Sequence, residues 1–174
     1  MCEEKKESCE LSDLVGLQVN RIGREGNMVD LEFGEDVTVT GDSGEKECRG
    51  AYVLTAYCPW RIVNLAKNKL YLGRLDIFDP AERVEAAEDF NYNTFEWNVP
   101  GQNLFDERAP QWFAGLEGVT VTGVQTDQFG DAQIKLSNGD SIEIRITATD
   151  GEECWRFVHT ESDIGFMMLG NCDL

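Results

Sequence analysis

Two arginines that each follow a tryptophan are the side chains of this sequence best suited to hold an anion. They occur in Trp60-Arg61-Ile62-Val63 and in Trp155-Arg156-Phe157-Val158, which contain the only Trp-Arg pairs of the chain. A guanidinium group is planar and binds a carboxylate or a phosphate through two parallel hydrogen bonds. Arg61 and Arg156 could therefore line one shared pocket for an anionic ligand.

The same arginines could instead stabilise the fold. The pattern L-G-x-x-D follows each Trp-Arg pair, and a turn that folds it back would bring Asp76 to Arg61 and Asp173 to Arg156. Charge-assisted hydrogen bonds would then close each copy of the motif. Both copies must fold, whereas a functional site needs only one copy or the interface between them. The repetition therefore favours this structural interpretation.

The tryptophans of the two motifs are expected to fill the core. Alternate side chains of a strand point to opposite faces of the sheet. Trp60 therefore shares a face with Ile62, and Trp155 shares a face with Phe157. The two arginines lie on the other face.

His159, the only histidine, could act as a general base. It follows the second Trp-Arg pair, at the position where the first copy has Asn64. Spacing places no serine, cysteine or carboxylate beside it, so no catalytic residue is predicted. An enzyme that uses His159 with a nearby acid stays open as a third hypothesis.

The six cysteines are expected to be reduced thiols with a structural role. They form no C-x-x-C pair, so a zinc site would have to gather its ligands from distant segments. The sequence has no phosphate-binding glycine motif and no loop with calcium-ligand spacing. No metal and no cofactor are therefore expected.

An aromatic, turn-rich segment could supply a binding pocket. Phe95, Trp97 and Phe105 lie within residues 91–108, among Asn, Pro and Gly residues that are typical of turns. We expect this segment to pack over a sheet as an ordered loop. Its three rings, with His159, are the candidates for lining a pocket between the two halves of the chain.

Two short helices are expected beside this segment. Asp79-Pro80-Ala81-Glu82 has the order of a helix start, with an acid as N-cap, proline in the first position and glutamate in the third. This helix should run to about Asp89. A second helix is expected near 107–114 and should end at Gly115.

These candidate residues lie within an internal duplication. Leu14-Val15-Gly16-Leu17-Gln18-Val19 and Leu116-Glu117-Gly118-Val119-Thr120-Val121 are similar at an offset of 102. Turn residues and strands with alternating polarity follow in both copies, as in β-hairpins. We align Gly34–Val39 with Gly139–Ile144 at an offset of 105, and interpret residues 52–58 as an additional strand of copy one.

The duplication predicts a mainly β fold with minor α content. Two related antiparallel sheets should pack with pseudo-two-fold symmetry, and the short helices belong to the connector. We expect a mobile acidic tail over residues 1–13, followed by a single domain. That domain consists of copy one (14–76), the connector (77–115) and copy two (116–174).

The net charge of −18 is concentrated in the second part of the chain. Residues 14–73 are almost neutral, with eight acids and seven bases. Residues 74–113 carry nine acids and three bases, and residues 114–174 carry eleven acids and three bases. Nucleic acids and anionic membranes are disfavoured as partners because both need a basic surface. A basic protein partner would be attracted by this charge. An acidic composition can also have the single role of keeping a protein soluble.

Nothing in the sequence predicts export or membrane insertion. No run of about 18 apolar residues is present. The segment Met1–Glu7 lacks the apolar core that a signal peptide needs. A cytoplasmic location is therefore expected.

Four segments of the chain resemble a group of uncharacterised bacterial proteins of similar length. The resemblance is carried by Cys58–Ile62, Trp97–Arg108, Phe129–Gly139 and Glu153–Phe157, and it extends over about residues 14–158. It implies a bacterial cytoplasmic protein with one whole-chain domain of duplicated Trp-Arg β units. It implies no particular activity.

Two functions fit these observations. The favoured one is a non-enzymatic interaction module that binds a protein partner through its acidic surface. In size and charge such a chain is similar to the immunity proteins of toxin systems. The alternative is a small-molecule-binding β scaffold with its pocket between the two copies.

Overall fold

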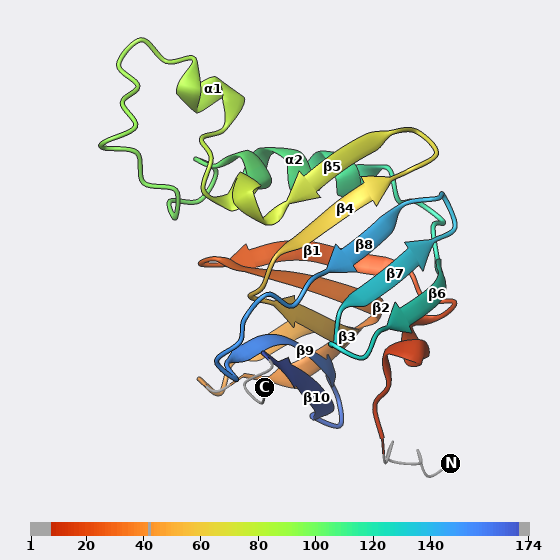
Figure 1. Cartoon of the computed structure of the whole chain (residues 1–174). Helices are drawn as coiled ribbons and strands as arrows, with labels where there is room; N and C mark the ends of the chain where they lie inside the picture. Colours follow the sequence, from red (N-terminus) through yellow and green to blue (C-terminus); the bar gives the residue numbers. More distant parts are fainter. Residues whose placement is uncertain (1–7, 42, 171–174) are drawn as a thin grey trace.

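Two five-stranded antiparallel sheets form most of this computed structural model, which describes residues 8–41 and 43–170 (Figure 1). The first sheet has the strand order β1 (Val19–Glu25), β2 (Met28–Thr40), β3 (Lys46–Ala56), β9 (Glu153–His159) and β10 (Ile164–Leu169). The second has the order β5 (Lys69–Gly73), β4 (Trp60–Asn64), β8 (Ser141–Ile144), β7 (Ala132–Leu136) and β6 (Val121–Thr126). The predicted mainly β fold with two antiparallel sheets is confirmed.

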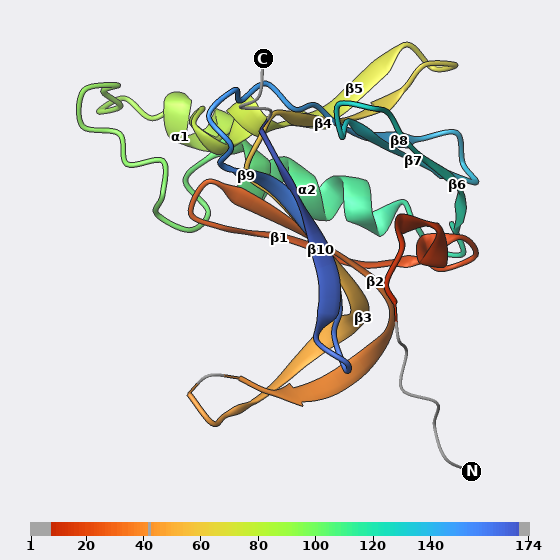
Figure 2. The same cartoon turned by 60° about the horizontal axis from the view of Figure 1, so that its bottom comes forward.

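The described chain also contains four short helices. η1 (Leu11–Leu14) precedes β1, whereas η2 (Arg74–Ile77), α1 (Glu82–Glu85) and α2 (Leu104–Ala114) lie in the connector between β5 and β6. α2 contacts β1 and β5 and lies between the two sheets at that side (Figure 2). None of these helices has the length and apolar content needed to span a membrane.

The two copies exchange their last hairpins. β3 of copy one pairs with β9 of copy two, so that the β9–β10 hairpin extends the sheet of β1, β2 and β3. In the same way β8 of copy two pairs with β4 of copy one, so that the β4–β5 hairpin extends the sheet of β6, β7 and β8. Leu54 of β3 lies opposite Phe157 of β9, and Ile62 of β4 lies opposite Ile142 of β8. Neither copy therefore has a complete sheet of its own.

The pseudo-two-fold axis passes near a bridge between Gln18 and Thr120. These residues occupy the same position in the two copies, at the offset of 102, and they pair with each other in antiparallel fashion. The register irregularity that follows Val19 in β1 recurs after Val121 in β6. The duplication is therefore expressed in the strand pairing itself.

The alignment of Gly34–Val39 with Gly139–Ile144 is wrong. β8 lies between β7 and the exchanged hairpin β4–β5, as the end of β3 lies between β2 and the exchanged hairpin β9–β10. The counterpart of Ile142 is therefore Leu54, within the strand that we interpreted as additional. Copy two lacks instead the outer part of the β2–β3 hairpin, residues 34–50, which extends beyond the sheet as a two-stranded arm (Figure 2). Alternation alone could not separate these segments, because both have the period of a strand.

Both tryptophans of the Trp-Arg motifs lie in the core. Trp155 is fully buried, and its indole nitrogen donates to the carbonyl oxygen of Gly130 at 2.9 Å. Trp60 is buried against the ring of Phe105, with 5.8 Å between the ring centroids in edge-to-face geometry. Its indole nitrogen has no hydrogen-bond partner in the described part of the chain. The connector helix therefore gives the two equivalent tryptophans different surroundings.

A buried carboxylate joins the three parts of the chain. Asp140, in the β7–β8 turn of copy two, is 3% exposed. It accepts hydrogen bonds from Asn64 of β4 at 2.8 Å, from Trp112 of α2 at 3.0 Å and from Asn138 at 3.0 Å. Copy one, the connector and copy two therefore meet at one acceptor.

The first connector helix is much shorter than predicted. α1 covers Glu82–Glu85 instead of running to about Asp89, and its N-cap is Ala81 instead of Asp79. Pro80 forms a bridge with the segment before α2, and Asp79 accepts a backbone hydrogen bond there. Because Asp79 and Pro80 pair with the segment before α2, Asp79 does not act as the N-cap of α1.

The second connector helix begins earlier than predicted. α2 starts three residues before the expected segment 107–114 and ends at Gly115 as expected. Its N-cap is Asn103, whose side-chain oxygen accepts a hydrogen bond from the backbone nitrogen of Asp106 at 2.8 Å. Asparagine is among the most favourable N-cap residues, so the helix includes the end of the segment that we expected to be a loop.

The folded part of the chain begins before the expected boundary at Leu14. η1 starts at Leu11, and both leucines are buried in the core. Part of the segment 1–13, expected as a tail, is therefore packed against the sheets. Residues 1–7 of that segment lie outside the described residues.

The exchange of hairpins predicts that the two copies do not fold separately. A cut after the exposed Asn93 gives fragments 1–93 and 94–174, and each lacks the strands that complete its sheets. We expect neither fragment to show near-ultraviolet circular dichroism or cooperative unfolding, and an equimolar mixture to recover both. Cooperative unfolding of either fragment alone would contradict the exchanged arrangement.

The Asp140 carboxylate is expected to contribute strongly to stability. Asp140→Ala leaves the buried Trp112 and Asn64 donors without their acceptor, so we expect the free energy of unfolding to fall by about 3 kcal/mol. Urea denaturation followed by tryptophan fluorescence measures this change. Glu117→Ala, which removes an exposed acid after α2, is the control and should change the unfolding free energy by less than about 0.5 kcal/mol.

Candidate functional site

The connector contains a loop that leaves the sheets and returns at the same point. Pro80 forms a bridge with Asn103. The backbone nitrogen of Ala81 donates to the carbonyl oxygen of Gln102 at 2.8 Å. Residues 81–102, the connector loop, project from the body of the molecule beside α1 (Figure 1). Long ordered loops with little regular structure usually serve a function.

An ion pair holds the base of the connector loop on β1. Arg24 donates two hydrogen bonds to Asp106, from Nε at 2.7 Å and from Nη2 at 2.8 Å. The Asp106 carboxylate also accepts one from the backbone nitrogen of Gly101 at 2.7 Å. Burial raises the pKa of Asp106, but the hydrogen bonds from Arg24 and Gly101 outweigh it and hold this pKa below its ordinary value.

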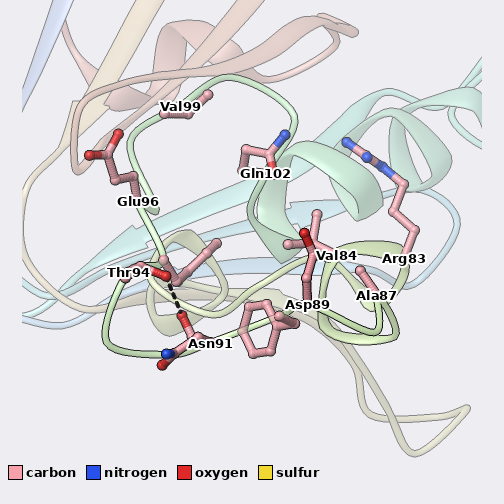
Figure 3. A pocket seen from close by; sticks show the side chains of 11 residues that line it. Arg83, Val84, Ala87, Asp89, Asn91, Thr94, Glu96, Val99 and Gln102 are labelled. Carbon is pink, nitrogen blue, oxygen red and sulfur yellow. Dashed lines mark hydrogen bonds between the residues drawn. The ribbon is translucent and has the colours of Figure 1, made fainter.

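A hollow of about 470 Å³, the connector hollow, lies inside this loop. Val84 of α1 and Val99 near the end of the loop line it from two sides (Figure 3). Phe90 and Phe95 also line it, with 5.9 Å between their ring centroids, and Tyr92 packs on Phe90 at 4.7 Å. The main core cluster of the described residues does not include these three rings. They form a separate apolar surface.

The surroundings of the connector hollow are acidic. Residues 81–102 carry five acids and one base. Asp89 and Glu96 line the hollow itself, together with the single base Arg83, and all three are exposed. Neither carboxylate takes part in an ion pair within the described ranges 8–41 and 43–170. A cation from outside could therefore pair with them.

Two further contacts form between side chains and groups of the same loop. The hydroxyl of the exposed Tyr92 donates to the Glu85 carboxylate, and this hydrogen bond raises the pKa of Tyr92. The guanidinium of Arg83 donates to the carbonyl oxygen of Gly101. The single base of the connector loop is therefore bonded to the backbone of the same loop.

The three predicted connector rings do not share one pocket. Phe95 lines the connector hollow. Trp97 packs edge-on against Phe78 at 4.9 Å. Phe105 is buried in the core beside Trp60. A single pocket between the copies that is lined by all three rings is not formed.

His159 lies on β9 in the first sheet. Its ring centroid is 4.9 Å from that of Tyr52, and its Nδ1 is 2.8 Å from the Oγ of Ser162. Among the described residues no carboxylate is bonded to it, and it does not line the connector hollow. His159 therefore has a serine hydroxyl beside it, but no carboxylate among the described residues that would orient its ring as in a catalytic triad.

Arg61 pairs across the sheet instead of with the turn that follows it. It binds Glu143 of the neighbouring β8 at 2.8 Å, and the expected bond to Asp76 is not formed. Asp76 accepts a hydrogen bond from the backbone nitrogen of Gly73 at 2.9 Å, and burial raises its pKa. The Asp76 side chain therefore closes the turn after β5 on the backbone of Gly73, without Arg61.

Arg156 of β9 binds acceptors at the start of its own strand and just after β3. It donates to Glu153 at 2.6 Å and to the hydroxyl of Tyr57. Its predicted partner, Asp173, lies outside the described residues. Arg61 lies in the second sheet and Arg156 in the first, so the two arginines do not line one pocket together.

The L-G-x-x-D pattern does not belong to the duplication. Gly73 lies opposite Arg61, whereas Met167 lies opposite the equivalent Arg156. Gly170, which we matched with Gly73, comes three residues later. The similarity of the two short patterns is therefore not a structural equivalence.

Two cysteines are buried thiols. Burial, together with the neighbouring Cys154, raises the pKa of Cys58 to about 12. Burial also raises the pKa of Cys154. At neutral pH such thiols carry almost no thiolate and react slowly. The described part of the chain holds no group of three His, Cys, Asp or Glu side chains arranged for a metal ion.

Two features of this site were missed in the sequence. Arg24 and Asp106 are 82 residues apart, and no spacing rule connects a strand of copy one with a helix of the connector. Phe90 gave a signal that could have been used, because it stands next to Asp89 and begins the same aromatic run as Phe95. An aromatic run among acids predicts an exposed apolar surface better than a buried one.

Comparison with protein-family models, with curated proteins and with solved structures found no match to this chain. The connector hollow is therefore interpreted from its own chemistry.

The Arg24–Asp106 pair predicts a pH-dependent contribution to stability. Asp106→Asn should lower the free energy of unfolding at pH 7 by about 3 kcal/mol, because Arg24 stays buried without its partner. The folded state depresses the pKa of Asp106 below 3.8. The contribution is therefore complete above this ordinary value and is lost as the pH falls through the folded-state pKa.

Urea denaturation of the wild type and of Asp106→Asn between about pH 7 and about pH 2.5 measures the difference between their free energies of unfolding. The difference should be constant down to about pH 4 and should shrink only below it. Glu107→Gln, which removes the adjacent acid, is the control and should show no such change. If the two free energies of unfolding already became equal near about pH 6, the pH dependence would not come from a carboxylate with a lowered pKa such as Asp106.

Proposed function

We propose that this chain is a non-enzymatic interaction module that binds a basic segment of a partner protein in the connector hollow. The observation that carries the proposal is a hollow in which Phe90 and Phe95 lie beside the acids of the connector loop. Apolar centres with a polar rim are typical of protein–protein interfaces. The acidic rim here selects for lysine or arginine in the partner.

The lining of the hollow suits a cationic side chain with an apolar stem. The ammonium or guanidinium group can pair with Asp89 or Glu96, while its stem packs on Phe90 and Phe95. The faces of aromatic rings also attract cations. Aromatic residues dominate the binding energy of many interfaces, so these two rings are the expected hot spot.

The connector loop is prepared for binding before a partner arrives. Its ends are closed by the bridge between Pro80 and Asn103, and its base is held by the ion pair of Arg24 with Asp106. A loop that is already ordered loses less conformational entropy on binding. This preorganisation supports a binding role for the loop over a role as a simple connection.

The acidity of the whole chain supports the same partner class. A net charge of −18 attracts a basic protein over several ångströms and increases its rate of association. The proposal places the protein in the cytoplasm, where its thiols stay reduced. An immunity-like role, in which the partner is a toxin with a basic surface, is one form of this function.

A library of displayed random peptides tests the proposal without knowledge of the natural partner. Peptides selected on the wild-type chain should be enriched in lysine or arginine near an apolar residue. Phe90→Ala combined with Phe95→Ala should weaken their binding by about 30-fold, because such rings contribute most of the energy of a small interface. Phe129→Ala removes an exposed ring elsewhere, in the β6–β7 turn, and should leave binding unchanged.

Charge variants complete this experiment. Asp89→Asn combined with Glu96→Gln should weaken binding and should reduce its dependence on salt, because the ion pairs of the rim are then absent. Glu117→Gln combined with Glu161→Gln changes the net charge equally at exposed positions outside the hollow. Selected peptides without basic residues, or equal effects of both charge variants, would refute a specific basic-segment site.

A further inference from the structure

A second hollow lies where copy one, the connector and copy two meet. It has a volume of about 590 Å³ and is lined by the β4–β5 hairpin, by α2 and by the β7–β8 turn. Figure 1 shows that these three segments converge at the same end of the second sheet. We call it the junction hollow. It shares no lining residue with the connector hollow.

The floor of the junction hollow is rigid. Trp112, Asn138 and Asp140 line it, and they are joined by the hydrogen bonds of the buried Asp140 carboxylate. A third hydrogen bond to this carboxylate comes from Asn64 beneath the hollow. Donors therefore already engage both oxygens of Asp140, and its negative charge is stabilised within the protein.

The rim of the junction hollow is basic, in a strongly acidic chain. Lys67, Lys69 and Arg108 line it, with Asp140 as the one acid among the lining residues. Three of the fifteen bases of the chain are thus gathered here, although its net charge is −18. This local cluster of positive charge contrasts with the negative net charge of the whole chain.

Two of these cations have no acidic partner. In the described ranges, neither Lys67 nor Lys69 takes part in an ion pair, whereas Arg108 binds the exposed Glu82 at 3.0 Å. The ammonium of Lys69 lies 4.7 Å from the ring centroid of Tyr71, another lining residue. In a chain with 33 acids, unpaired lysines over a shaped hollow are available to an anion from outside.

We infer that the junction hollow binds a small organic anion, a carboxylate or a phosphate monoester with a planar or apolar body. The ammonium groups of Lys67 and Lys69 would hold the anionic group by charge-assisted hydrogen bonds. Tyr71, Leu70 and Trp112 would contact the body. Ligand sites of this kind combine an apolar lining with a few placed charges. This inference does not depend on the partner proposed for the connector hollow.

The indole N–H of Trp112 reports directly on the junction hollow, because it is bonded to Asp140 in the floor. We would titrate the ¹⁵N-labelled full chain with phenyl phosphate, benzoate and phenol, and follow the four tryptophan indole signals by NMR. Phenyl phosphate or benzoate should shift the Trp112 signal saturably, and phenol should not. The signal of Trp155, bonded to Gly130 in the core, should stay in place. The tighter of the two anions identifies the phosphate or the carboxylate class.

Matched lysine variants decide whether the rim recognises the anion. Lys67→Gln combined with Lys69→Gln changes two exposed side chains, so the fold should be retained, and should weaken binding at least about tenfold. Lys135→Gln, an exposed lysine on β7, should leave the affinity unchanged. No saturable shift of Trp112, an equal shift with phenol, or an equal loss in Lys135→Gln would each overturn the inference.

Discussion

The Asp140 carboxylate accepts hydrogen bonds from a strand of copy one, from the connector helix and from its own turn in copy two. A buried carboxylate destabilises the fold unless hydrogen-bond donors surround it. The three segments that supply these donors must therefore pack together at Asp140. α2 is held against the second sheet by this contact. The floor of the junction hollow is made of the same residues. The contact of α2 with the second sheet, and with it the floor of the junction hollow, therefore depends on this acceptor, whereas the Arg24–Asp106 pair holds the base of the connector loop.

The same position in the other half shows how the two copies diverged. Asn64 stands opposite Asp140 at the end of β4, and the equivalent pair in the first sheet is His159 with Tyr52. There the rings pack on each other, and His159 bonds to Ser162 instead of to a buried acid. The connector helix α2 contacts the second sheet at this position, so only the second sheet needs a buried acid that binds a helix. Asymmetry at equivalent positions thus follows from topology and does not require catalysis by His159.

The candidate binding surfaces lie in the parts that the copies do not share. The exchanged hairpins use the repeated residues, including Trp60 and Trp155, to build the core. The connector loop adds a hollow with aromatic rings and two exposed acids, and the junction adds a hollow with a basic rim. The two hollows share no lining residue, so the basic segment that we propose and the anion that we infer would not compete for one site. The β framework serves mainly to position both.

Periodicity, turn residues and the repeated Trp-Arg pairs determined the mainly β class and the duplication, because these signals are local or directly comparable along the chain. The end of α2 at Gly115 was predictable for the same reason. The exchange of hairpins was decided only in three dimensions, since alternation within β4 and β9 does not reveal which strand lies beside them. The pairs Arg24–Asp106 and Arg61–Glu143 each join residues 82 positions apart. No local pattern encodes such contacts, because strand pairing in the second sheet places Glu143 opposite Arg61, and the packing of α2 on β1 brings Asp106 to Arg24.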